Sequence, residues 1–148
     1  MSSARLVMIG VMLTLVSGVG HVAAQSTPMM PDPRIALNLA PLADADLKQS
    51  MEEHLQALQA IVAALAQEDY GRASAIAHKE LGFPKHHQVM QRERGVSYPK
   101  KYQELAIAHH QAAENLADAI DTKKMRPILQ QLDATMRACL DCHLAFKL

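Results

Sequence analysis

The chain has 148 residues, with 15 basic and 15 acidic side chains, no tryptophan, three tyrosines and two phenylalanines. Its balanced charge provides no basic surface of the kind that attracts nucleic acid, so no nucleic-acid partner is expected. Because aromatic side chains normally supply much of a core's buried area, a small domain with so few of them is marginal on burial alone.

Residues 1–24 have the pattern of a secretory signal peptide. Arg5 supplies the positive charge, residues 6–19 form an apolar stretch, and Val22-Ala23-Ala24 is a small-residue cleavage site. The alternative is a membrane anchor, but the apolar stretch is somewhat short for a membrane span. We therefore expect export to the periplasm, cleavage after Ala24, and no stable membrane insertion afterwards.

Residues 25–43 form a leader whose four prolines prevent a continuous helix. The domain proper is expected at residues 44–148, and its first helix at residues 44–67, with Asp44 or Asp46 as the N-cap. Steps of three and four residues predict a core-facing stripe made of Leu47, Met51, Leu55, Leu58, Val62 and Leu65. His54 borders this stripe.

Three further helices are expected. The second covers residues 69–81, where Gly82 and Pro84 predict its end. Residues 85–95, which include His86 and His87, are predicted to be a solvated loop. The third helix covers residues 99–121, and its core-facing stripe is expected to contain Tyr102, Leu105, His109, Ala112, Leu116 and Ile120. After a turn at residues 122–126, Pro127 fits the first turn of a fourth helix. No stretch shows a strand pattern.

The fourth helix carries the run Cys139-Leu140-Asp141-Cys142-His143. Cys-x-x-Cys-His is the sequence mark of c-type haem attachment. Both cysteines become thioethers on the haem vinyl groups, and the histidine becomes an axial iron ligand. A disulfide or a thioredoxin-like pair is the alternative, but the latter needs a βαβ context. Zinc would need four ligands where this run offers three. We predict one covalent haem c, which would also supply the apolar bulk that the composition lacks.

The spacing of the fourth helix places the haem-binding residues on its apolar stripe. Residues three and four apart share a helical face. The stripe is expected to contain Leu129, Leu132, Met136, Cys139, His143 and Phe146. His143, the proximal iron ligand, should therefore be buried among the helices. For His109 and His110 we expect hydrogen-bonded positions at the surface, with haem contact as the alternative.

A helical domain that ends in this motif resembles the class II cytochromes c, the cytochrome c′ family and its low-spin relatives. The resemblance covers about residues 44–148, and the ending Cys-x-x-Cys-His-x-x-aromatic-basic is its specific part. Phe146-Lys147 stands where the family often has Tyr-Arg, which puts any role of a guanidinium there in doubt. The resemblance implies an all-α, antiparallel four-helix bundle with the haem on its C-terminal helix, and family members often form homodimers.

The segment Met51-Glu52-Glu53-His54-Leu55 is similar to the first helices of a subgroup of such cytochromes. The family implies that this helix supplies the residue over the second iron face. Met51 is our expected distal ligand, with His54 or an open iron as alternatives. Methionine implies a low-spin electron carrier, whereas an apolar residue implies a five-coordinate iron that binds NO or CO.

The expected function is therefore one-electron transfer with redox partner proteins in the periplasm. Binding or buffering of small gases is the alternative, and an accessory haem subunit is a third possibility. No nucleophile is paired with a base in the sequence, so we do not expect an enzyme.

Overall fold

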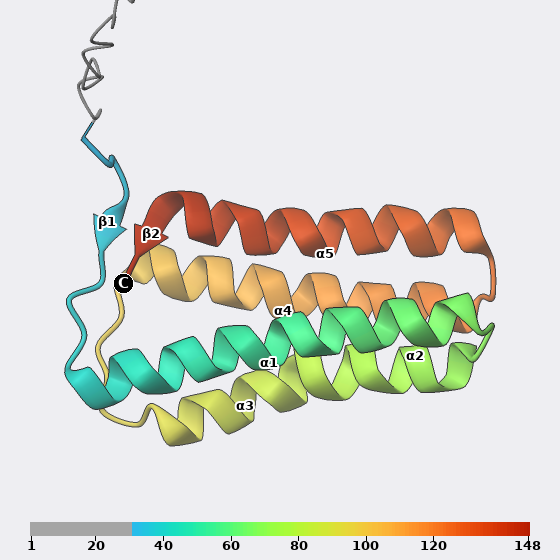
Figure 1. Ribbon diagram of the computed structural model, residues 1–148, viewed down its shortest axis with the longest axis horizontal. Coiled ribbons are helices and arrows are strands. Elements are labelled where there is room, and N and C mark those ends of the chain that lie inside the picture. The colour runs from blue at the N-terminus through green and yellow to red at the C-terminus, as the bar shows by residue number, and fades with distance from the viewer. Residues whose placement is uncertain (1–30) are drawn as a thin grey trace, which may run out of the picture. The chain divides into compact units, whose positions relative to one another are not determined.

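The computed structural model describes residues 31–148, and this part of the chain is mostly helical (Figure 1). The predicted signal peptide and the first part of the leader lie outside the described residues. The elements are β1 (Ile35–Ala36), α1 (Pro41–Ala66), α2 (Tyr70–Ile76), the π-helix η1 (Ala77–Leu81), α3 (Phe83–Arg92), α4 (Lys100–Asp121), α5 (Met125–Ala145) and β2 (Phe146–Lys147). With α2, η1 and α3 counted as one broken segment, four helical segments pack together. None of the helices in residues 31–148 is long and apolar enough to span a bilayer.

Helix α1 begins at Pro41, earlier than predicted, because proline is compatible with the first turn of a helix. Its buried residues are Leu47, Ser50, His54, Ala57, Ile61, Ala64 and Leu65. The predicted stripe is wrong at Leu55 and Val62, which are 69% and 51% exposed. The buried face of α1 is displaced from the predicted stripe by about one residue, because small side chains such as Ala57 contact the neighbouring helices. A second face of α1, rich in large apolar residues, is consequently left open.

The segment after α1 breaks and restarts instead of ending at Gly82. Asp69 caps α2 by accepting a hydrogen bond from the Arg72 backbone N–H at 3.1 Å. The loop predicted for residues 85–95 is wrong, because α3 occupies most of it. Pro84 lies in the first turn of α3, a position that proline tolerates well.

Glu114 of α4 stabilises this restart from another helix. Its carboxylate accepts a hydrogen bond from the Phe83 backbone N–H at 2.8 Å and another from His78 Nδ1 at 2.6 Å. One of the first N–H groups of α3, which no residue within the helix can satisfy, thus finds a partner. The cap comes from a residue distant in the sequence, so local sequence rules could not predict it.

Gly82 is required at this break because of close contacts rather than an unusual backbone angle. A Cβ there would collide with the backbone oxygen of His78 and the carboxylate of Glu114. We expect Gly82→Ala to lower the free energy of unfolding by about 3 kcal/mol, since overpacking against backbone cannot relax easily. Thermal unfolding followed by circular dichroism would measure this loss.

Gly71 provides the matched control for that substitution. It lies in α2, and a Cβ there would have no neighbour within 4 Å. Gly71→Ala should therefore be neutral or slightly stabilising, because alanine has the higher helix propensity. Equal melting temperatures for Gly82→Ala and the unmodified protein would show that the contact at Gly82 is not tight.

Helices α4 and α5 agree with the predicted third and fourth helices to within a few residues. Helix α4 packs against α2, η1, α3 and α5, so it is the central element. Helix α5 packs closely on α4, whereas α1 and α5 are not a closely packed pair in the described residues. Helices α1 and α5 each pack on another helix, but they do not pack closely on each other.

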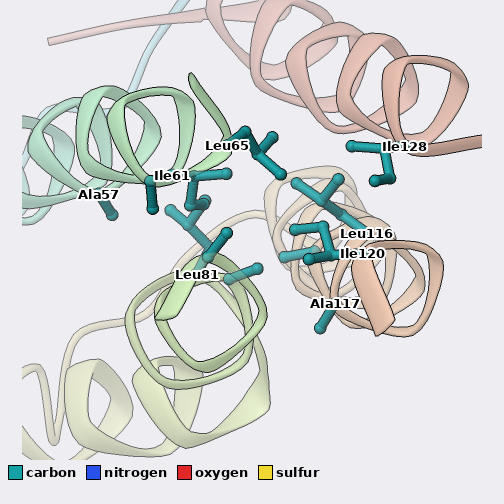
Figure 2. Packing of buried hydrophobic residues seen from close by; sticks show 12 residues of the cluster. Ala57, Ile61, Leu65, Leu81, Leu116, Ala117, Ile120 and Ile128 are labelled. Atoms are coloured by element: carbon teal, nitrogen blue, oxygen red, sulfur yellow. The ribbon is translucent and has the colours of Figure 1, made fainter. Parts of the chain in front are cut away.

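The buried residues divide into an apolar and a polar group along the helices. Figure 2 shows the apolar core, which contains Ala57, Ile61, Leu65, Leu81, Leu116, Ala117, Ile120 and Ile128. The polar group comes mainly from the earlier turns of α1 and α4 and from α3 and the segment after it. It contains Ser50, His54, Lys85, Glu93, His109 and His110. The end of α5 that carries the cysteines lies beside His109 of this polar group, whose Nδ1 is 3.5 Å from Cys139 Sγ, and beside the buried side chain of Phe146.

Glu93 is a buried carboxyl group in this polar region. It is 6% exposed, its Oε1 has no hydrogen-bond partner, and burial raises its pKa above the usual value. A raised pKa in the folded state means that stability is full at acid pH and falls as the pH rises and the folded protein must bury a charge. Glu93→Gln should therefore raise the free energy of unfolding at pH 7 by about 1 kcal/mol.

The pH dependence separates this effect from simple repacking. Below about pH 4 the Glu93 carboxyl is neutral in both states, so the gain should vanish there. Thermal melts from pH 4 to pH 8 would measure the gain in stability of Glu93→Gln at each pH. Glu104→Gln, at an exposed position of α4, is the control. A gain that is independent of pH would contradict the buried-charge explanation.

Two short strands, which the sequence did not predict, join the leader to the end of the chain. β1 pairs with β2 in parallel, with Ile35 opposite Phe146, and the Leu37 N–H donates to the Lys147 carbonyl at 3.0 Å. Phe146 is buried and meets the Tyr102 ring edge to face, with 5.7 Å between ring centroids. These contacts fix the chain immediately after the cysteine-containing turns of α5.

Candidate functional site

The Cys-x-x-Cys-His run occupies the last turns of α5. Cys139 and Cys142 are half-buried free thiols, and burial raises the pKa of both. His143 is exposed, so the predicted burial of this histidine is wrong. Leu129 and Met136, on the same predicted stripe, are exposed as well. The residues of the predicted stripe lie along one face of α5, but several of them are exposed instead of packing against another helix.

An open cavity of about 580 Å³ lies along this face of α5. Cys139 and His143 line it, together with the apolar side chains of Met136, Leu140 and Leu58 from α1. Cavities of roughly 300–1,000 Å³ with mostly apolar walls are typical of small-molecule and cofactor sites. The thiol and the imidazole therefore face a space of suitable size for a large apolar group.

Large apolar side chains are exposed on both helices that border this cavity. They are Leu55 and Val62 on α1, and Leu129, Met136, Leu140 and Leu144 on α5. Proteins rarely leave gathered apolar side chains uncovered unless something binds them. A flat, apolar ring with an iron atom fits the thiol of Cys139, the imidazole of His143 and the apolar side chains of this cavity, whose remaining lining residues are Asp133 and Arg137. Cys142 lies one helical turn after Cys139 and does not line the cavity.

Met51 and His54, the two sequence candidates for the distal ligand, lie three residues apart on neighbouring parts of one side of α1, but they differ in burial. Met51 is half-buried and lies two turns before Leu58, so both residues share the face that borders the cavity. His54 is 9% exposed and points into the polar region, where its ring centroid is 5.0 Å from that of His109. Burial lowers the His54 pKa to about 4, so its imidazole is neutral at pH 7.

Glu53 fixes this part of α1 against α3. Its carboxylate accepts hydrogen bonds from Lys85 Nζ at 2.5 Å and from Arg92 at 3.1 Å, which lower the pKa of Glu53 to about 2. Lys85 is almost completely buried by this contact. The two cations of α3 thus hold the turn of α1 that carries both ligand candidates.

The surface positions expected for His109 and His110 are wrong. They are 7% and 4% exposed, and they join His54 and His86 in a group of contacting rings that we call the histidine cluster. His110 Nδ1–H donates to the Leu81 carbonyl at 2.6 Å. Burial lowers the His109 pKa to about 3. His87, by contrast, is exposed as expected.

His109 connects the histidine cluster to the cysteine run. Its Nδ1 lies 3.5 Å from Cys139 Sγ, while the Nε2 atoms of His109 and His54 are buried without a hydrogen-bond partner. The position of His109 on the predicted α4 stripe was the available signal for its burial. No sequence rule could indicate its contact with a residue 30 positions away.

Lys147, the basic residue that follows Phe146, forms an ion pair with the leader. Its Nζ lies 3.5 Å from Asp32 Oδ2 in the leader, so it ties the end of the chain to the segment before β1. Within residues 31–148, no group of three or more histidine, cysteine or acidic side chains is arranged to bind a metal ion directly.

The chain matches no protein-family model, and neither a curated protein nor a solved structure matches it significantly. Its function must therefore be argued from its own residues and their geometry.

Proposed function

We propose that this protein is a periplasmic c-type cytochrome that resembles the class II cytochromes c and transfers single electrons between redox proteins. The observation that carries the proposal is the position of the Cys-x-x-Cys-His run, whose Cys139 and His143 line an apolar cavity beside α5. The sequence motif indicates haem attachment, and the cavity supports it independently of the motif.

In this proposal an antiparallel four-helix bundle holds the haem between α1 and α5. Cys139 and Cys142 would hold it covalently, and His143 would bind the iron through a neutral imidazole nitrogen. When bound, the haem supplies a one-electron iron couple. The chain's own apolar residues, including Leu58 and Leu140, would exclude water from the ring.

Met51 is our proposed second axial ligand, because it lies on the face of α1 that borders the cavity. A thioether ligand raises the reduction potential relative to a second histidine, which suits an electron carrier. His54 is the alternative, since its Nε2 is buried without a partner. Either residue, together with His143, would leave the haem iron no open coordination position, so the bound haem would supply electron transfer without turnover of a small substrate.

Expression with the periplasmic machinery for c-type cytochromes tests the proposal. Intact-mass measurement should give a chain beginning at Gln25 plus one haem that survives acid–acetone extraction. Optical spectra and voltammetry should then show low-spin iron and a reversible one-electron wave. Extractable haem, or none, would contradict covalent attachment. High-spin iron that binds carbon monoxide after reduction to the ferrous state would favour the gas-binding alternative.

A further inference from the structure

The contact between His109 and Cys139 constrains the protons of both groups. His109 Nδ1 lies 3.5 Å from Cys139 Sγ, and its Nε2 is buried without a partner. Neutral imidazole has one N–H donor and one lone-pair acceptor, and the partner of one nitrogen decides the state of the other. The partner of His109 Nδ1 is Cys139, whose thiol becomes a thioether in the proposed function.

A free thiol leaves both tautomers of His109 open. The thiol can donate its S–H to a bare Nδ1, or its sulfur can accept from Nδ1–H. Addition of a thiol across a vinyl group breaks the S–H bond, forms one S–C bond and places the hydrogen on the adjoining carbon, with no net oxidation. The resulting thioether sulfur can only accept a hydrogen bond.

We propose that covalent attachment at Cys139 fixes His109 in the Nδ1–H tautomer, so that His109 positions the first thioether and presents Nε2 as a buried lone pair. This inference rests on the proposed function, because it needs a thioether at Cys139. His109 is the positioning residue here: its N–H holds the sulfur against α4, and its Nε2 gains the acceptor character that a proton donor or a metal ion requires.

The structure supports a fixed tautomer because His109 has few alternatives. Its ring is 7% exposed, so bulk water cannot satisfy either nitrogen. Burial lowers its pKa to about 3, so the doubly protonated form is absent at neutral pH. The neighbouring rings of His54 and His110 lie with their centroids 5.0 Å from that of His109, and neither ring makes a hydrogen bond to it.

His110 gives an internal reference in the same protein. Its Nδ1 faces the Leu81 carbonyl at 2.6 Å, and a carbonyl can only accept, so His110 is Nδ1–H whatever happens at Cys139. His109 and His110 are adjacent in sequence and equally buried, yet only His109 depends on the sulfur. A measurement of both tautomers therefore separates the proposed effect from general changes in the histidine cluster.

The test is ¹⁵N–¹H correlation spectroscopy of the imidazoles in the haem-loaded, reduced protein, with carbon monoxide added if the iron is high-spin. Wild-type His109 should show the Nδ1–H pattern, like His110. In Cys139→Ala, with the haem held through Cys142, His109 should change to Nε2–H while His110 stays the same. In Cys142→Ala, which keeps the thioether at Cys139, His109 should remain Nδ1–H.

The outcomes separate this inference from the proposed function. A mass spectrum without covalent haem would refute the proposed function and remove the basis of the inference with it. Covalent haem with wild-type His109 as Nε2–H, or protonated on both nitrogens, would overturn the inference alone. An unchanged Nδ1–H pattern in loaded Cys139→Ala would also overturn it, because another group would then fix the tautomer. If the cysteine variants do not incorporate haem, the tautomer of His109 in the haem-loaded wild-type protein still tests the inference.

Discussion

Replacement of both Cys139 and Cys142 by alanine should abolish covalent haem and strongly destabilise the folded domain. The physical reason is that α1 and α5 expose large apolar side chains such as Leu55 and Leu140, which no other part of residues 31–148 covers. A cofactor that binds only the folded state stabilises it by about 4 kcal/mol or more. Its loss should lower the melting temperature by more than about 10 °C. Intact mass and circular dichroism measure the two effects.

Asp141→Ala is the control, since this exposed residue lies between the two cysteines and its side chain makes no hydrogen bond within residues 31–148. It should retain covalent haem and the wild-type transition. If instead the double cysteine variant unfolded cooperatively at the wild-type temperature, the helices would be stable without a cofactor, and the open apolar faces would need another explanation.

The second large effect concerns the distal ligand. Met51→Ala should convert low-spin ferric iron to high-spin and remove the methionine–iron charge-transfer band, because the shortened side chain has no donor atom. The reason for choosing Met51 is its place on the cavity face of α1, two turns from Leu58. His54→Ala should keep the band, although it removes a ring from the histidine cluster. Optical spectra of the ferric variants measure both results.

Leu55→Ala serves as the control, because this residue is exposed on the same helix and carries no donor atom. Its spectrum should match that of the unmodified protein. If Met51→Ala left the spectrum unchanged while His54→Ala gave high-spin iron, the ligand would be histidine. High-spin iron already present in the unmodified protein would mean an open coordination position.

The helices that the sequence predicted well are those with long, regular patterns. The expected third and fourth helices agree with α4 and α5 to within a few residues. Helix α3 was missed because Gly82 and Pro84 are ordinary stop signals, and the carboxylate that caps the new helix belongs to Glu114, 31 residues after Phe83. A restart that depends on a distant side chain has no local sequence signature.

The face of a helix proved harder to predict than the helix itself. Leu47 and Leu65 of α1 are buried as predicted, but Leu55 and Val62 are exposed. Ser50, His54 and Ala57 are buried instead. A pattern of hydrophobicity finds apolar faces and does not distinguish a face that meets another helix from one that meets a ligand. The same limit applies to His109, whose burial beside Cys139 depends on how α4 and α5 pack.

The separation of apolar and polar buried residues implies that the molecule does not open uniformly. Backbone amides around Ile61, Leu116 and Ile120 lie in the apolar core, so only a global opening should let them exchange with deuterium. The Nε2 atoms of His54 and His109 are buried without a hydrogen-bond partner, so we expect the turns that carry them to open more readily than the apolar core. The proposed haem site would then lie beside the part of the domain that opens first. Such a division would let a modifying enzyme reach Cys139 and Cys142 without unfolding the whole domain.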